Sequence, residues 1–84
     1  MIELTVNEVR DFLRADAEND IVIIPLLDTA ISYVTSAVGA ENAFTADPRC
    51  VSAVSFKTYD MFHVTDVFEA SITALISQVR ADPY

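Results

Sequence analysis

A single glycine, Gly39, and three prolines are the only residues of these two types in this 84-residue chain. Glycine supports tight turns and positive φ angles, and proline marks most other breaks in regular structure. A chain with so few of these residues has little material for turns. We therefore expect a single all-α domain over residues 1–84, a small bundle of about four helices without repeats or linkers.

Capping signals and apolar spacing predict the first two helices. Thr5 and Glu8 have the spacing of a capping box, so the first helix starts at Thr5. A polar acidic loop, residues 15–20, follows it. The second helix is predicted over residues 21–38, with Asp20 as its cap and the glycine as its stop. One apolar stripe of this helix is expected to face the core: Ile23, Leu27, Ala30, Ile31, Val34, Ala37 and Val38.

Two further helices are predicted in the second half of the chain. The third covers residues 47–62, because the dipeptide Asp-Pro at its start places a cap before a proline in the first turn. The fourth covers residues 66–80, where Asp66 and Glu69 repeat the capping-box spacing. The loop before the third helix carries Phe44, which we expect to reach the core.

The composition indicates association with other protein chains. Apolar residues make up 52% of the chain, whereas a domain of this size buries only about 60% of the surface of its unfolded chain. Large exposed apolar patches mark interfaces, so we expect self-assembly or an obligate partner. The 13 acidic and 5 basic residues give a net charge of −8. This charge argues against a sequence-specific DNA reader, since affinity for nucleic acid comes mainly from lysine and arginine.

A membrane location is not expected. The longest uninterrupted apolar run, Ile21–Leu27, is too short to span a bilayer. The chain also opens without a charged stretch followed by an apolar run, so we expect no signal peptide and a soluble protein.

Cys50 and His63 are the one conventional pair of nucleophile and base. Thirteen residues apart on one helix, they are separated by about 20 Å along its axis, far beyond hydrogen-bond reach. We interpret Cys50 as a small buried thiol and expect no enzyme activity and no cofactor. No second nitrogen or sulfur ligand stands near His63, so we do not expect a metal site there.

Acidic residues gather after the first predicted helix. Asp16, Glu18 and Asp20 have the 1-3-5 spacing of a calcium loop, but Ile21 stands where the sixth position requires glycine. We therefore interpret these three residues as a solvated acidic surface, together with Asp28 on the polar side of the second helix.

The predicted third helix carries apolar side chains on two faces. One face, the expected core side, comprises Cys50, Val51, Val54, Met61 and Phe62. Phe56, Tyr59 and His63 lie on the opposite face. A short helix with two apolar faces is either enclosed within its own domain or buried against a partner, and both alternatives stay open. These three residues are the candidate interface with another copy or partner.

Short motifs follow one another along the chain in a distinctive order. Residues 4–14 form a capped helix with the sequence LTVNEVRDFLR, which an acidic loop follows. Residues 30–33 supply an Ala-x-x-Tyr element, residues 48–54 a proline-led third helix and residues 74–80 a closing Ala-Leu-Ile-x-x-Val-Arg element. This order resembles the tailed-phage head–tail connector family. Residues 69–70 are Glu-Ala where members of that family carry a proline and an aromatic residue.

The resemblance implies a structural virion protein at the head–tail interface, made in the host cytoplasm during assembly. Such proteins form a ring, commonly of twelve subunits, below the portal protein, and join it to a stopper or tail-completion protein. The ring lines the DNA channel, where an acidic wall repels phosphate and lets DNA pass without binding. The alternative is a small acidic regulatory adaptor that binds a single protein partner.

Overall fold

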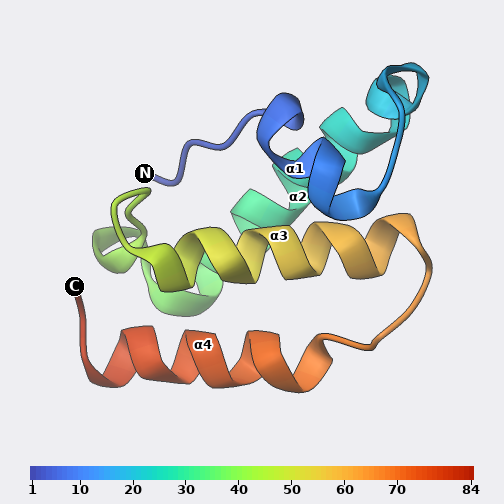
Figure 1. Ribbon diagram of the computed structural model, residues 1–84. Coiled ribbons are helices and arrows are strands. Elements are labelled where there is room, and N and C mark those ends of the chain that lie inside the picture. Colours follow the sequence, from blue (N-terminus) through green and yellow to red (C-terminus); the bar gives the residue numbers. More distant parts are fainter.

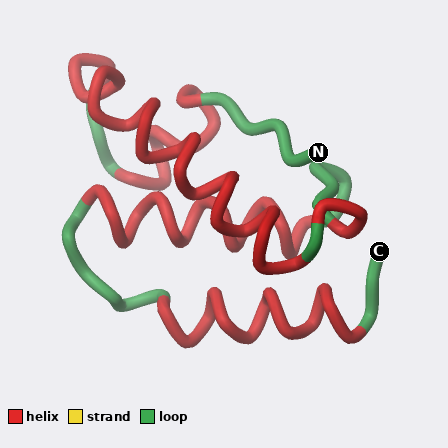
Figure 2. The backbone as a smooth tube through the Cα atoms, turned by 180° about the vertical axis from the view of Figure 1, so that it is seen from behind, coloured by secondary structure: helices red, strands yellow, loops and turns green.

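The computed structural model describes residues 1–84, and its chain is all-helical, without strands, as predicted. Its four α-helices are α1 (Val6–Leu13), α2 (Asp20–Val38), α3 (Pro48–Phe62) and α4 (Glu69–Ala81), and two short 3₁₀ turns cover residues 17–19 and 40–42. In Figure 1, α3 runs across the middle of the molecule, with α4 on one side and α1 on the other, and α2 passes behind it. Figure 2 shows the same arrangement from behind, with the long α2 crossing α3 obliquely.

The core lies around α3, which packs against both α2 and α4, whereas α2 and α4 contact each other much less. The predicted stripe of α2 is confirmed in its buried members, which are Ile23, Leu27, Ala30, Val34 and Val38. Leu13 of α1, Cys50 and Val54 of α3, and Val79 of α4 close the core around them. Ile2, which precedes the first helix, is also buried, because Thr45 accepts a hydrogen bond from the Glu3 N–H and donates one to the Met1 carbonyl oxygen.

The prediction for Phe44 is wrong, because its neighbour Ala43 fills the core position. Ala43 is fully buried, and Phe44 is 40% exposed. The side-chain amide of Asn42 donates to the carbonyl oxygen of Val38 and holds the chain against the end of α2. Ala43 is extended there, and successive side chains of extended backbone point to opposite sides. Phe44 therefore turns outward.

The predicted cap at Asp20 is also wrong. α2 begins at Asp20 itself, after the 3₁₀ turn that occupies part of the predicted acidic loop. The Asp20 carboxylate accepts instead from Arg10 of α1, with Arg10 Nε 2.9 Å from Asp20 Oδ1. This hydrogen bond raises the pKa of Arg10 above its ordinary value. The ion pair ties α1 to the start of α2 and neutralises one member of the predicted acidic surface.

The start of α4 depends on a residue of α3. The helix begins at Glu69, three residues later than predicted, and the Asp66 side chain makes no capping hydrogen bond. Asp60, which is 7% exposed, accepts from the Phe68 N–H with its Oδ2 at 3.2 Å. The predicted capping box is therefore wrong. The Asp60 carboxylate of α3 takes its place, because the α3–α4 loop folds the start of α4 against it.

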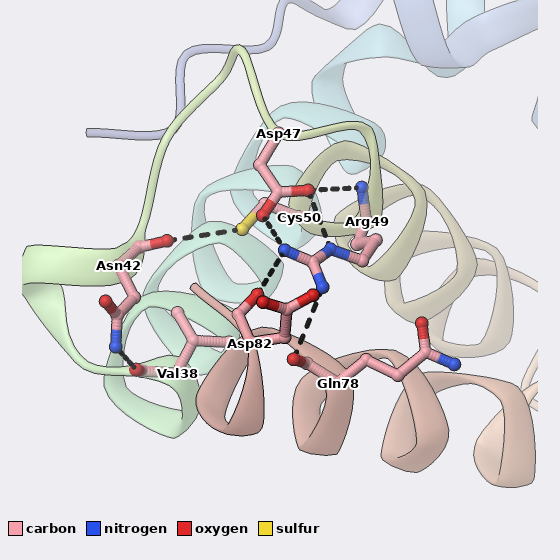
Figure 3. Close-up of polar contacts among 7 residues, drawn as sticks. All are labelled: Val38, Asn42, Asp47, Arg49, Cys50, Gln78 and Asp82. Atoms are coloured by element: carbon pink, nitrogen blue, oxygen red, sulfur yellow. Dashed lines mark hydrogen bonds and ion pairs between the residues drawn. The ribbon is translucent and has the colours of Figure 1, made fainter. Parts of the chain in front are cut away.

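Arg49 fastens the end of α4 to the start of α3. Asp47 caps α3 as predicted, since its Oδ1 accepts from the Arg49 N–H at 3.0 Å. The Arg49 guanidinium donates to both oxygens of the same carboxylate, at 3.1 and 3.0 Å, and reaches the carbonyl oxygens of Gln78 and Asp82 at 3.3 and 2.8 Å (Figure 3). Those carbonyls lie at the end of α4, where backbone donors become scarce, and that of Gln78 also accepts from the Asp82 N–H. Arg49 thus pairs with a fully buried carboxylate and caps a second helix.

The loop that follows α3 contains a strained residue, Val64, whose φ angle is 52°. The Thr65 N–H donates to the carbonyl oxygen of Asp60 at 2.9 Å, which is the long bond of a Schellman helix ending. A β-branched residue rarely adopts a positive φ angle, because its side chain crowds the backbone. Val64 is 89% exposed, so packing does not offset this strain.

We expect Val64→Gly to raise the free energy of unfolding by about 1 kcal/mol, since glycine reaches this conformation without crowding. Val67→Gly is the matched control, because Val67 is an exposed valine of the same loop without a positive φ angle. This control should leave stability unchanged or lower it. Urea denaturation of both variants makes the comparison, and equal effects at the two positions would show that strain at Val64 is negligible.

Candidate interaction surface

The predicted interface residues Phe56, Tyr59 and His63 come together on α3, and two phenylalanines from other elements join them. The Phe12 ring of α1 lies 5.7 Å from the Phe56 ring and 5.5 Å from the Tyr59 ring, measured between centroids. The Phe68 ring stacks on Phe56 at 4.4 Å and meets Tyr59 edge-on at 5.1 Å. Tyr59 also lies 4.4 Å from His63. These five residues are called the aromatic cluster below.

The aromatic cluster joins three elements of the chain and still has an exposed side. Phe56, Tyr59 and Phe68 are half-buried, whereas Phe12 is 38% exposed and His63 is exposed. Both alternatives for this face of α3 therefore have a physical basis. One side of the cluster packs within the domain, and the other side faces solvent.

His63 and Cys50 have separate structural partners. His63 Nε2 lies 2.8 Å from the carbonyl oxygen of Leu13, the last residue of α1, so an Nε2–H group donates to a carbonyl that lacks a helical partner. The Cys50 thiol donates to the carbonyl oxygen of Asn42 at 3.6 Å and is fully buried, which confirms the predicted buried thiol. Burial raises the pKa of Cys50 and keeps the thiol protonated.

The first turns of α2 expose three large aliphatic side chains within four residues. Ile21 is 82% exposed, Val22 51% and Ile24 48%. These residues are called the α2 patch below. The molecule measures 38 × 23 × 17 Å and buries 17 of its 84 residues, so it is too thin to enclose its apolar side chains. The other large apolar side chains that stay exposed, outside the aromatic cluster, are Met1, Tyr33, Phe44, Val64, Val67 and Tyr84.

By length and composition alone, the segment Ala17–Val38 is apolar enough to cross a membrane, with a mean hydropathy of 1.8. The core helix of a soluble protein can have the same composition when it is mostly buried. Here α2 supplies five residues to the core, but only 28% of the most apolar stretch is buried. The unusual feature of α2 is that apolar residues also occupy its solvent side.

The predicted acidic surface is reduced to three exposed residues, Asp16, Glu18 and Asp28, because Asp20 is paired with Arg10. No group of three or more histidine, cysteine, aspartate or glutamate side chains lies close enough together to hold a metal ion. The arrangement therefore offers apolar and aromatic contact surface on an acidic body. Comparisons with models of protein families, with curated proteins and with solved structures found no match.

Proposed function

We propose that this chain is a structural subunit that works by binding other protein chains. The observation that carries the proposal is the α2 patch, since its three aliphatic side chains remain in water in the isolated chain. Removing apolar surface from water contributes about 25 cal/mol per Å², so a partner that covers the patch gains free energy. Contiguous exposed apolar surface on a small protein is typical of an interface.

The specific assembly we propose is a ring at the head–tail junction of a tailed phage, below the portal protein and above a stopper or tail-completion protein. The order of motifs along the chain supports this assignment. A closed ring needs two different surfaces on each subunit, because each copy contacts its two neighbours head to tail. The α2 patch and the exposed side of the aromatic cluster are candidates for these two surfaces. The net charge of −8 suits a channel through which DNA slides.

Negative-stain images of the chain mixed with the portal protein of the same genome test the ring directly. We expect the images to show a ring formed by this chain below the portal and coaxial with its channel. A compact dimer of the chain that does not bind the portal protein would instead favour the alternative, an acidic adaptor with a single protein partner.

We expect Ile21→Asp to weaken assembly about ten-fold or more while changing the free energy of unfolding by less than about 0.5 kcal/mol. Ile21 is 82% exposed, and an aspartate in the first turn of a helix is favourable. Tyr59→Asp discriminates less well, because Tyr59 contacts Phe12 and Phe68 of its own chain. Sedimentation velocity measures assembly, and urea denaturation measures folding.

Ser77→Asp is the control for added charge, since it places the same carboxylate on the exposed side of α4. Assembly of this variant should match that of the wild type. Equal weakening by both substitutions would mean that charge alone opposes assembly and that the α2 patch is not the contact.

A further inference from the structure

A groove with a volume of 260 Å³ lies between α2, α3 and α4. Met61 and Ile72 give it an apolar lining, and Asp66 and Glu69 place carboxylates at the start of α4. Lys57 supplies the one cationic side chain. The groove therefore combines apolar contact surface with an excess of negative charge.

A cation already occupies part of this groove. The Lys57 ammonium lies 4.4 Å from the centroid of the Tyr33 ring, within the range of a cation–π interaction. The ion pairs of the chain involve only Arg10 with Asp20 and Arg49 with Asp47. The carboxylates of Asp66 and Glu69 are therefore not neutralised by a cation of their own chain.

The Asp60 carboxylate also lines the groove and has spare acceptor capacity. It is 7% exposed, and its two oxygens share one donor, the Phe68 N–H, at 3.2 and 3.4 Å. An ionised carboxylate has about four acceptor positions, so the Asp60 oxygens can accept further hydrogen bonds beside the one from Phe68. A ligand that carries several N–H donors matches this site.

We infer that the groove binds an arginine or lysine side chain of a different protein. The aliphatic stem of such a side chain fits the apolar lining of Met61 and Ile72. Its charged end fits the carboxylates of Asp60, Asp66 and Glu69.

The charge of the chain decides between another copy and a different protein. Of the five basic residues, Arg10 and Arg49 are held in ion pairs and Lys57 lies in the groove. Only Arg14 and Arg80 remain to enter the groove of a neighbouring copy, so a second copy offers few cations. A basic segment of another protein supplies them without this limit.

A peptide titration tests this inference, which rests on the proposed function only in assuming that the chain binds protein. The probe is acetyl-Ala-Ala-Arg-Ala-Ala-amide, followed by ¹H–¹⁵N spectra of the full-length Ile21→Asp chain. We expect shifts confined to the groove and binding about five-fold weaker for the same peptide with uncharged citrulline. Equal binding of both peptides, or shifts elsewhere on the chain, would overturn the inference.

Two charge-matched double variants locate the site. Asp66→Asn with Glu69→Gln removes two charges from the groove, and Asp16→Asn with Glu18→Gln removes two from the acidic surface, whose residues do not line the groove. The first pair should weaken binding about five-fold and the second less than about two-fold. Lys57→Gln should strengthen binding, because it removes the competing cation.

Equal losses in the two double variants would indicate general attraction to an acidic protein and contradict a specific groove. The peptide readout does not require ring formation, so failure of the ring and failure of the groove are distinguishable.

Discussion

Replacing Ile23 by alanine is expected to lower the free energy of unfolding by about 3 kcal/mol, whereas Ile21→Ala should change it by less than about 0.5 kcal/mol. The two isoleucines stand two residues apart on α2. Ile23 is fully buried in the core, and Ile21 is 82% exposed. Shortening the side chain to alanine therefore leaves a cavity in the core at Ile23, whereas at Ile21 it only removes exposed apolar surface.

Ile24→Ala extends this comparison, since Ile24 is 48% exposed and should fall between the other two in stability. The loss of association should follow the reverse order and be largest for Ile21→Ala. Ile23→Ala should weaken association only as far as it unfolds the chain. Urea denaturation and sedimentation of the three variants give both orders. Similar stability losses at Ile21 and Ile23 would mean that α2 buries a different face from the one described above.

Replacing Asp47 by alanine should cost about 3 kcal/mol of stability, because the change removes a helix cap and leaves Arg49 without its buried partner. Asp47 is fully buried and accepts three hydrogen bonds from Arg49. Asp66→Ala is the matched control, since Asp66 precedes a helix in the same way but makes no capping bond. It should change stability by less than about 0.5 kcal/mol. A loss at Asp66 as large as the loss at Asp47 would contradict the assigned roles.

Asp47 also makes stability depend on pH. Hydrogen bonds from the Arg49 side chain hold the pKa of Asp47 below its ordinary value of 3.8 in the folded chain. As the pH falls, the unfolded chain therefore binds the proton first. The stabilising contribution of Asp47 is complete above about pH 5 and is lost as the pH falls through the ordinary pKa to the lower pKa of the folded state.

Asp47→Asn isolates this contribution, because asparagine can still cap the helix but does not titrate. Below about pH 4, the wild type should lose stability more steeply than Asp47→Asn. Urea denaturation between about pH 5 and pH 3 measures both slopes. Parallel slopes for the two proteins would show that the Asp47 carboxylate is not held ionised by Arg49.

Local patterns were sufficient to predict most of the helical architecture. The spacing of Thr5 and Glu8, the Asp47-Pro48 pair and the position of Gly39 each place a helix end within one residue of its position in the structure. Gly39 has a φ angle of 92°, which other residues rarely adopt. These signals succeed because the groups that cap each helix are neighbours in sequence.

The prediction fails where a partner comes from another element. Asp20 looks like a cap, but Arg10 of α1 competes for its carboxylate. Asp66 and Glu69 have the spacing of a capping box, but the N–H group at the helix start donates to Asp60 of α3 instead. No spacing rule within one helix contains these contacts, because they depend on how two helices pack.

The candidate surface was predicted only in part, for the same reason. Phe56, Tyr59 and His63 share a face of α3 by helical periodicity alone. Phe12 and Phe68 belong to other elements, and only the packing of α1 and the α3–α4 loop brings them into the aromatic cluster. The exposed isoleucines of α2 could not be predicted, because they belong to an apolar run that is equally compatible with a fully buried segment.

Native mass spectrometry of the chain at micromolar concentration, alone and mixed with the portal protein of the same genome, tests most directly whether it works by binding protein chains. We predict a closed oligomer, either of the chain alone or assembled on the portal, and its loss in Ile21→Asp. A chain that stays monomeric in both samples, or assemblies that Ile21→Asp leaves intact, would contradict the proposed role of the α2 patch.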